Sequence, residues 1–228
     1  MLQWPPTPGD LYLEPSPHRL VFQGDIFADV PFIKAQGGDT PDADPRIRTE
    51  RRLVTPILYP CDMYVDGRGV LGRVQAVALV HSAEGVRIPD DWAGAFTVCP
   101  LPDLMGDGAM WLADFRAIAN VDRSYLRVEH RVHSLTEAGW AVFRQRLALA
   151  STRLSIDLDD LRIGGAITWE ESVLWQRWNE AGRDPGAFHD WYDGEDDYLD
   201  RMTRRQALER GLTEQVRLAL TREIQPAA

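Results

Sequence analysis

Short apolar runs follow one another along the first two thirds of the chain, with no helical pattern between them. They cover residues 53–59, 74–81, 95–99, 110–121 and 125–129, and each is bounded by Gly, Pro or Asp. Runs of this length that are rich in β-branched and aromatic residues are typical of strands. Because no helix separates these strands, the sequence predicts a small β-barrel or a strongly bent sheet.

The periodicity changes after residue 129. Ser134 and Glu137 have the S-x-x-E spacing of a capping box, in which each side chain satisfies an exposed backbone N–H. The apolar residues that follow recur every three or four positions, so we expect a helix that packs on the sheet. The residues on its buried face are Trp140, Phe143, Leu147 and Ala150.

Two segments are rich in residues that break regular structure. Residues 1–19 contain five prolines, which exclude a helix and predict an extended arm, with one short strand at residues 11–13. Residues 35–50 are dense in Gly, Pro and Asp and predict a long mobile loop. The barrel domain with its capping helix is therefore expected at residues 20–152, which makes the fold mainly β plus α.

Residues 153–228 are predicted to form a separate helical extension. From residue 151 onward the chain holds 16 acidic and 10 basic side chains, a net charge of −6. Thr168 and Glu171 suggest a second capping box, opening a helix that stops near Gly182. Asp184 and Pro185 suggest the start of a short helix. A last helix, beginning at Glu195 or after Thr203, carries leucines, a valine and an isoleucine at four-residue spacing: Leu208, Leu212, Val216, Leu220 and Ile224.

Large aromatic residues are concentrated in this extension. Six of them lie within thirty residues: Trp169, Trp175, Trp178, Trp191, Tyr192 and Tyr198. The extension alone is too small to bury all six. Either they pack against the barrel, or they form a surface that binds another protein, because rigid aromatic side chains dominate interface energetics.

Composition excludes several classes of function. The net charge of −10 argues against a general binder of nucleic acid or of anionic membranes, since both need a basic face. No apolar run approaches the roughly 20 residues that span a bilayer, and the start has no signal-peptide pattern. Two cysteines are too few for a disulfide framework, which favours a reducing compartment. We therefore expect a cytoplasmic protein, or one assembled into a virion.

The run VTPILYPCDMYV ends in Cys61 beside Asp62, and two interpretations remain open. Cys61 could be a reactive thiol with His81 as its base. Alternatively, it is a small buried residue at the end of a strand, with Asp62 in the following turn. The second interpretation is favoured because free cysteine is among the most commonly buried residue types.

Two patterns superficially resemble metal sites. Glu129, His130 and His133 form E-H-x-x-H, but the order differs from that of the zinc motif HExxH. An acidic cluster at residues 190–200 lacks the alternating loop that supplies calcium ligands in sequence. We therefore predict no metal site and no cofactor.

Four segments together resemble the MazF/PemK-type toxins. They are QGDIF (23–27), RRLVTPILYP (51–60), VQAVALVHS (74–82) and the run from Met110 to Leu149, so the resemblance covers about residues 20–150. It implies an SH3-like barrel. In that family a G-D-I turn opens the barrel, an R-P strand and a strand ending in P-x-T-S follow, and a D-x-x-x-I-x-x-V-D segment leads into a helix.

The family resemblance also implies a candidate active site. Most members are ribonucleases that use the arginine of R-P and the threonine of P-x-T-S. The arginine position falls on Arg51 or Arg52, with Leu53 in place of the proline. The threonine position falls near His81 and Ser82, so both motifs depart from the family at the catalytic groups. His81 could act as a general base near neutral pH.

Two functions follow as expectations. The first is a non-catalytic structural or protein-interaction module, of the kind that serves as a connector or accessory component in a phage or another multi-protein assembly. Its partners are other protein subunits, in a homo-oligomer or a larger assembly, bound through the six aromatic residues of the extension. The alternative is a MazF/PemK-like endoribonuclease, or its inactive regulatory derivative, that uses Arg51, Arg52, His81 and Ser82.

Overall fold

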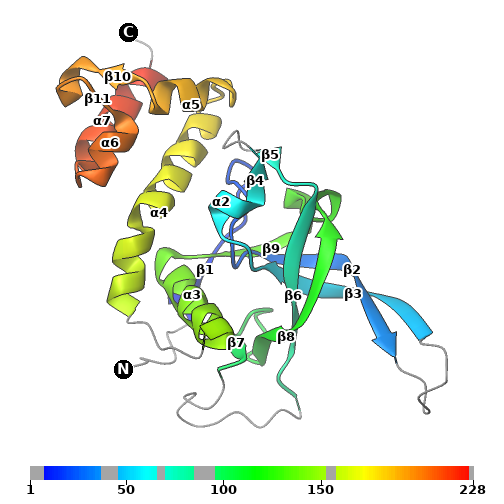
Figure 1. Ribbon diagram of the computed structural model, residues 1–228. Coiled ribbons are helices and arrows are strands. Elements are labelled where there is room, and N and C mark those ends of the chain that lie inside the picture. Colours follow the sequence, from blue (N-terminus) through cyan, green and yellow to red (C-terminus); the bar gives the residue numbers. More distant parts are fainter. Residues whose placement is uncertain (1–7, 37–45, 66–69, 85–95, 153–157, 226–228) are drawn as a thin grey trace. The chain divides into compact units, whose positions relative to one another are not determined.

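The computed structural model describes residues 8–36, 46–65, 70–84, 96–152 and 158–225 of the 228-residue chain. The fold is mixed α/β, with a curled antiparallel half-barrel sheet and several helices (Figure 1). The chain divides into two compact units. The sheet unit comprises the described residues within Met1–Pro15, Val21–Met63 and Leu71–Arg162, and the helical unit those within Ser16–Leu20, Tyr64–Val70 and Ile163–Ala228.

Seven strands form the main sheet, in the order β1-β9-β2-β3-β6-β8-β7, and every neighbouring pair is antiparallel. Their bounds are β1 Tyr12–Leu13, β2 Ile26–Gln36, β3 Arg46–Pro56, β6 Val74–Ser82, β7 Val98–Pro102, β8 Met110–Asp122 and β9 Arg131–Leu135. The chain also forms two short helices, α1 Pro8–Leu11 and α2 Pro60–Met63, and a two-stranded sheet of β4 Tyr64–Val65 and β5 Val70–Leu71. The prediction that residues 1–19 exclude a helix is wrong, because α1 begins at Pro8, where the first turn of a helix tolerates proline. The short strand predicted at residues 11–13 is β1, which pairs with β9.

The predicted strands at residues 74–81 and 110–121 are confirmed as β6 and β8. The strand predicted at 95–99 is shifted, because β7 is an edge strand and so tolerates Pro100 and Pro102. The loop predicted at 35–50 is wrong at both ends, where β2 and β3 pair from Val30↔Arg52 to Gln36↔Arg46. Its centre, residues 37–45, lies outside the described residues.

The strand predicted at residues 125–129 is also wrong. Two short 3₁₀ turns, η1 Arg123–Tyr125 and η2 Val128–His130, occupy this stretch. The Asp122 carboxylate accepts the Ser124 N–H at 2.9 Å, which caps the first turn and ends β8. The strand that follows is β9, and it places Arg131 in the interior of the sheet unit.

Helix α3, Glu137–Thr152, packs on the sheet as predicted (Figure 1). Of the four residues predicted on its buried face, Trp140 and Phe143 are buried, whereas Leu147 and Ala150 are half-buried. The Phe143 ring lies edge-on to Phe115 of β8 at 5.4 Å between centroids. The predicted capping box is displaced, because Ser134 belongs to β9. The Thr136 hydroxyl caps the helix instead and accepts the Gly139 N–H at 3.0 Å.

The QGDIF turn, which leads into β2, contacts this helix through hydrogen bonds. Gly24 has a φ of +89°, which favours glycine. The side chain of Gln23 bridges two elements: its Oε1 accepts the Trp140 indole N–H at 3.2 Å, and its Nε2 donates to the Ile57 carbonyl at 2.8 Å. The Asp25 carboxylate accepts the Phe22 N–H at 2.8 Å and faces Arg131 at 3.5 Å, in the interior.

The helical unit contains α4 Leu158–Glu180 from Ile163 onward, together with α5 Ala187–Tyr192, α6 Arg204–Glu209 and α7 Thr213–Ile224. Between α5 and α6 lie β10 Glu195–Asp196, the 3₁₀ turn η3 Asp197–Leu199 and β11 Met202–Thr203. The helix start predicted at Thr168 is wrong, because Thr168 lies inside α4. The predicted stop is confirmed: Gly182 has a φ of +68°, and the Arg183 N–H donates back to the Trp178 carbonyl at 3.3 Å.

The single last helix that was predicted is two helices. Gly211, with a φ of +77°, separates α6 from α7. Thr203 begins α6 with a complete capping box to Gln206. None of the helices in the described residues is long and apolar enough to cross a bilayer.

The helical unit has its own core, built mostly from aromatic and aliphatic side chains of its four helices. Its buried members are Leu174, Trp175, Trp178, Phe188, Trp191, Tyr192, Leu199, Ala207, Leu208, Val216, Ala219 and Leu220. Residues 16–20 of the N-terminal segment belong to this unit. Leu20 packs against the core, the Arg19 guanidinium lies 4.7 Å from the Trp169 ring centroid, and Asn179 donates to the His18 carbonyl at 3.3 Å.

Candidate functional site

His81, near the end of β6, is the sequence-predicted residue with the most suggestive surroundings. Its Nδ1 lies 2.8 Å from the Ser82 carbonyl oxygen. Because a carbonyl only accepts hydrogen bonds, Nδ1 carries the proton in this contact. The other nitrogen, Nε2, lies 3.8 Å from Oδ2 of Asp114, so an ion pair forms when the imidazole is protonated.

Asp114 reaches His81 because of an irregularity in β8. The register steps from Ala78↔Ile118 to Leu79↔Asp114, so residues 115–117 have no partner in β6. Such a bulge re-aims side chains on the longer strand. Arg116, within this irregular stretch, donates from Nε and Nη2 to the two oxygens of Asp114, at 2.9 and 2.8 Å. The Arg116 backbone N–H adds a third bond at 2.9 Å.

These contacts set the charge of the site. Burial alone raises the pKa of Asp114, but the hydrogen bonds and charge of Arg116, with His81 nearby, outweigh burial and hold that pKa below its usual value. Asp114 is therefore ionised near neutral pH. Its side chain is only 11% exposed, whereas that of Arg116 is 66% exposed. A buried carboxylate thus lies between an imidazole and an outward-facing guanidinium.

This arrangement allows His81 to transfer a proton next to an anion bound by Arg116. The Nε2 of His81 can accept a proton, and Asp114 would stabilise the imidazolium that results. The guanidinium of Arg116 has five N–H groups, of which two bind Asp114, so the others can bind an anion such as a phosphate.

The other predicted catalytic residues lie in different surroundings. Arg51 donates to the Asp29 carbonyl at 2.7 Å, and Arg52 pairs with the Glu50 carboxylate, with 2.9 Å from its Nε to Oε2. The Ser82 hydroxyl accepts the Glu84 N–H at 3.2 Å. The structure therefore brings His81 together with Asp114 and Arg116, two residues that the sequence analysis did not select.

The thiol hypothesis concerns Cys61. Cys61 lies in α2, but its side chain lies outside the described residues. The other cysteine, Cys99, is buried in β7, and burial raises the pKa of its thiol to about 12. At neutral pH Cys99 is therefore a protonated, unreactive thiol.

Four of the six predicted partner-binding aromatic residues pack inside the helical unit. Trp175, Trp178, Trp191 and Tyr192 belong to its core. Trp169 is half-buried under Arg19. Tyr198, in η3, is 79% exposed and is the most accessible of the six.

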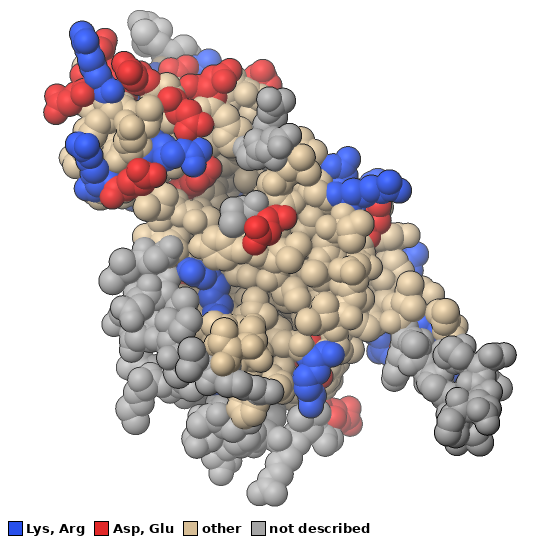
Figure 2. All heavy atoms as spheres, viewed as in Figure 1, with Lys and Arg blue, Asp and Glu red and all other residues tan. Residues whose placement is uncertain are grey.

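The surroundings of Tyr198 are strongly charged. The Arg222 guanidinium of α7 lies 4.3 Å from its ring centroid, within the range of a cation–π contact. Beside the ring is a hollow of about 280 Å³, which we call the Tyr198 hollow. It is lined by Glu195, Asp196, Asp197, Tyr198, Arg204, Ala219, Arg222 and Glu223. In Figure 2 acidic side chains are concentrated over the helical unit.

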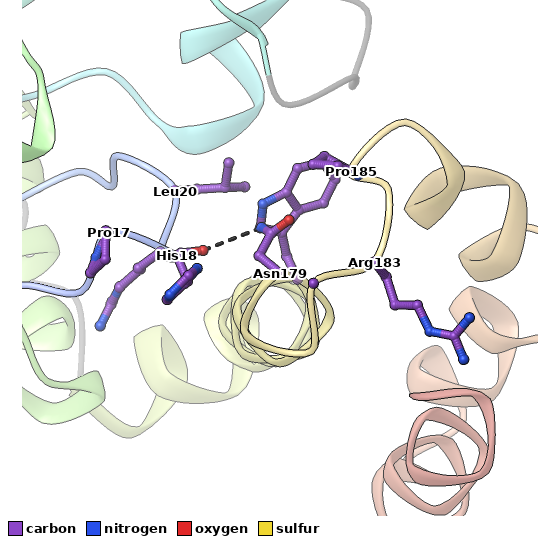
Figure 3. Close-up of a pocket in the computed structure, with 9 residues that line it drawn as sticks. Pro17, His18, Leu20, Asn179, Arg183 and Pro185 are labelled. Carbon is purple, nitrogen blue, oxygen red and sulfur yellow. Dashed lines mark hydrogen bonds between the residues drawn. The ribbon is translucent and has the colours of Figure 1, made fainter. Parts of the chain in front are cut away.

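A second hollow, of about 450 Å³, lies between residues 17–20 and the end of α4 (Figure 3). Trp175, Leu20 and Pro185 supply apolar walls, and Asn179 supplies an amide. Arg183 points away from it, and its guanidinium donates to the Glu223 carbonyl. The volume is in the range of small-molecule sites, but most of the polar groups around it already bind the protein itself.

The histidines of E-H-x-x-H are separated, since His130 lies in η2 and His133 in β9. In the part of the chain that the structure describes, no group of three or more His, Cys, Asp or Glu side chains is arranged to hold a metal ion. No protein-family model matches the chain, and no curated protein matches it.

Proposed function

We propose that the protein is a non-catalytic interaction module of a multi-protein assembly, and that the outer part of the β2–β3 hairpin is its main contact element. This part, the β2–β3 ribbon, consists of residues 30–36 and 46–52. It is carried by the sheet unit, which we assign to the SH3-like barrels of MazF/PemK type on the strength of the QGDIF turn and the strand order. A connector or accessory component of a phage particle fits this architecture.

The main support for this proposal is that the ribbon is a two-stranded extension of the sheet with open edges. On one side β9 pairs with β2 only at Ile26 and Phe27, and on the other β6 pairs with β3 only over residues 53–56. In Figure 1 the hairpin extends past the neighbouring strands of its unit. Two strands alone are marginally stable in water, and open edges are the usual site of strand addition by a partner.

The ribbon also exposes apolar side chains. Ile33 is 60% and Ile47 is 70% exposed. The register pairs Ile33 with Thr49 and Ala35 with Ile47, so both isoleucines belong to the same face of the ribbon. Proteins usually keep β-branched residues of an open strand covered, which supports a partner on this face.

The test measures the size of the complex that contains the protein in the cells that produce it. We expect the wild type to elute in an assembly larger than a monomer, and Ile33→Asp with Ile47→Asp to release it. Leu218→Asp, on the exposed face of α7, is the matched control and should leave the assembly intact. A wild type that elutes as a monomer, or a ribbon variant that stays assembled, contradicts the proposal.

A second candidate is the endoribonuclease, and the arrangement of His81, Asp114 and Arg116 favours it. His81 would take the proton of the attacking ribose hydroxyl, and Arg116 would bind the phosphate. If this candidate is correct, wild type cleaves a mixed-sequence RNA, and His81→Ala lowers the rate by about 10²–10⁴-fold. The family resemblance adds Arg52→Ala and Ser82→Ala as further losses.

The control for RNA cleavage is Arg127→Ala, which removes an exposed arginine of the sheet unit at the start of η2. Cleavage that persists unchanged in His81→Ala would show that His81 is not the general base. Absence of cleavage by the wild type removes this candidate and leaves the interaction module.

A further inference from the structure

His189, in α5 of the helical unit, has a ring nitrogen that is buried among aromatic side chains. Its ring lies 5.2 Å from the Trp175 ring of α4 and 5.5 Å from the Phe188 ring, between centroids. The residue as a whole is half-buried, but Nε2 is sealed from solvent and has no hydrogen-bond partner among the described residues. A buried polar atom without a partner lowers stability, so the state of this nitrogen matters to the unit.

The position of the ring suits a neutral imidazole and not a charged one. In the neutral ring the proton can reside on Nδ1, which leaves Nε2 as a bare acceptor. Protonation gives Nε2 an N–H and the ring a positive charge, and no described residue offers Nε2 an acceptor. Because the ring packs on Trp175, the cost of this charge falls on the contact between α5 and α4.

The charged groups around the ring act in both directions. Burial lowers the pKa of His189 and Arg205 of α6 lowers it further, whereas Asp193 and Asp190 raise it. Asp193 is itself paired with Arg205, at 2.7 Å between Oδ1 and Nε, which compensates much of its charge. From α4 the ring meets Trp175, which carries no charge. Burial therefore outweighs the two aspartates, and the pKa of His189 lies below its ordinary value.

We propose that His189 is an acid-sensitive switch of the helical unit, whose protonation loosens α5 from α4 and opens the aromatic core between them. The Phe188 ring lies 4.8 and 5.8 Å from those of Trp175 and Trp178 in α4. The Trp191 ring lies 5.5 Å from that of Trp178. A helix of six residues is stable only through such packing, so loosening it uncovers the tryptophans of α4.

The direction of the pH effect follows from the lowered pKa. In the unfolded chain His189 titrates near its ordinary pKa of 6.5, and the folded unit binds the same proton less tightly. The stability that His189 contributes is therefore present above about pH 6.5 and is lost as the pH falls through the lower folded pKa. We expect the helical unit to open more readily at about pH 5 than at about pH 7.5.

Glu171 of α4 is a second buried group of the unit, and it titrates in the opposite sense. Burial raises the pKa of its carboxyl, Arg205 lowers it and Asp193 raises it, and the result is a raised pKa. The stability that Glu171 contributes is present below its ordinary pKa of 4.5 and is lost as the pH rises through the raised pKa. Acidification thus strengthens the unit at Glu171 while weakening it at His189. The substitution Glu171→Gln removes the opposing titration.

The experiment measures hydrogen exchange of the α5 amides in the full-length Glu171→Gln protein at about pH 7.5 and about pH 5. Each rate is divided by that of an unstructured peptide at the same pH, and the β2 amides of the sheet unit are the internal reference. We expect the protection of α5 relative to β2 to fall several-fold at the lower pH. Adding His189→Phe, which keeps an aromatic ring but cannot be protonated, should abolish most of this fall.

Two further variants make the comparison decisive. His189→Gln removes the titration with a smaller polar side chain and should give the same result if the phenyl ring disturbs the packing. His18→Gln replaces the other histidine of the unit, which is exposed, and should keep the full fall in protection.

Three results would overturn the proposal. They are α5 protection that does not change with pH in Glu171→Gln, a change that persists in both His189 variants, and a change that disappears in His18→Gln. The switch lies within the helical unit and the measurement does not involve the β2–β3 ribbon. Its failure therefore leaves the proposed function untouched, and the reverse holds as well.

Discussion

Asp25→Ala should lower the free energy of unfolding of the sheet unit by about 3–5 kcal/mol. The side chains of Asp25 and Arg131 are 1% and 2% exposed, and they face each other at 3.5 Å. The substitution removes the carboxylate and leaves the guanidinium in the interior. It also removes the acceptor of the Phe22 N–H in the turn that precedes β2. Both losses leave buried polar groups without their present partner, which costs more than the pair itself contributes.

The measurement must report on the sheet unit alone, because a chain of two units need not unfold in one step. Hydrogen exchange of the β2 and β9 amides in denaturant provides that report. Asp25→Asn keeps an acceptor for Phe22 but loses the charge, so it should cost less than Asp25→Ala. Asp62→Ala, at an exposed aspartate, is the control and should change stability by at most about 0.5 kcal/mol. Equal stability of Asp25→Ala and the control would show that the buried pair does not hold the turn.

Strands with one buried face were predictable from the sequence, whereas strands without one were not. β6 and β8 carry apolar residues along most of their length, and both were found. The outer half of β3 reads R-I-R-T-E and has no apolar side to bury, so local composition indicated a loop. β9 was missed for a related reason: it begins with Arg131, whose burial depends on Asp25, a hundred residues away in the chain.

Helix boundaries failed where capping patterns occurred by chance. Thr168 and Glu171 have the spacing of a capping box, but α4 continues through them, from Leu158 to Glu180. Of the two predicted starts of the last helix, the one after Thr203 is correct, and there Thr203 and Gln206 form a complete capping box. The spacing of a capping box alone could not distinguish a pair inside a helix from a pair at its start, because tertiary packing decides where a helix begins and ends.

Only one of the three residues of the candidate site was predicted from the sequence. His81 was selected because histidine at a strand end is a natural general base. Asp114 and Arg116 lie in an apolar run, where the D-x-R pair was the only local sign of a polar site. Their approach to His81 depends on the change of register between β6 and β8, which leaves three residues of β8 without a partner in β6. The spacing of apolar residues along β8 does not predict this change.

Phe188→Ala should lower the free energy of unfolding of the helical unit by about 3–5 kcal/mol. Phe188 is fully buried, and besides the adjacent His189 its ring contacts four Trp and Tyr rings at centroid distances of 4.8 to 5.8 Å. Those neighbours are Trp175, Trp178, Trp191 and Tyr192. Removing the ring leaves a cavity that these large side chains cannot fill without moving off their present contacts.

The loss would leave little stability in the helical unit. Domains carry roughly 0.05–0.15 kcal/mol per residue, so a unit of this size has only a few kcal/mol to lose. We therefore expect tryptophan fluorescence of Phe188→Ala to shift to that of exposed indoles at much lower denaturant concentration than in wild type, while exchange of the β2 amides is unchanged. Tyr198→Ala, at an exposed ring of the same unit, should unfold like wild type. If the two variants unfolded alike, the aromatic residues would not form the core of the unit, and their role as a surface for a partner would again be open.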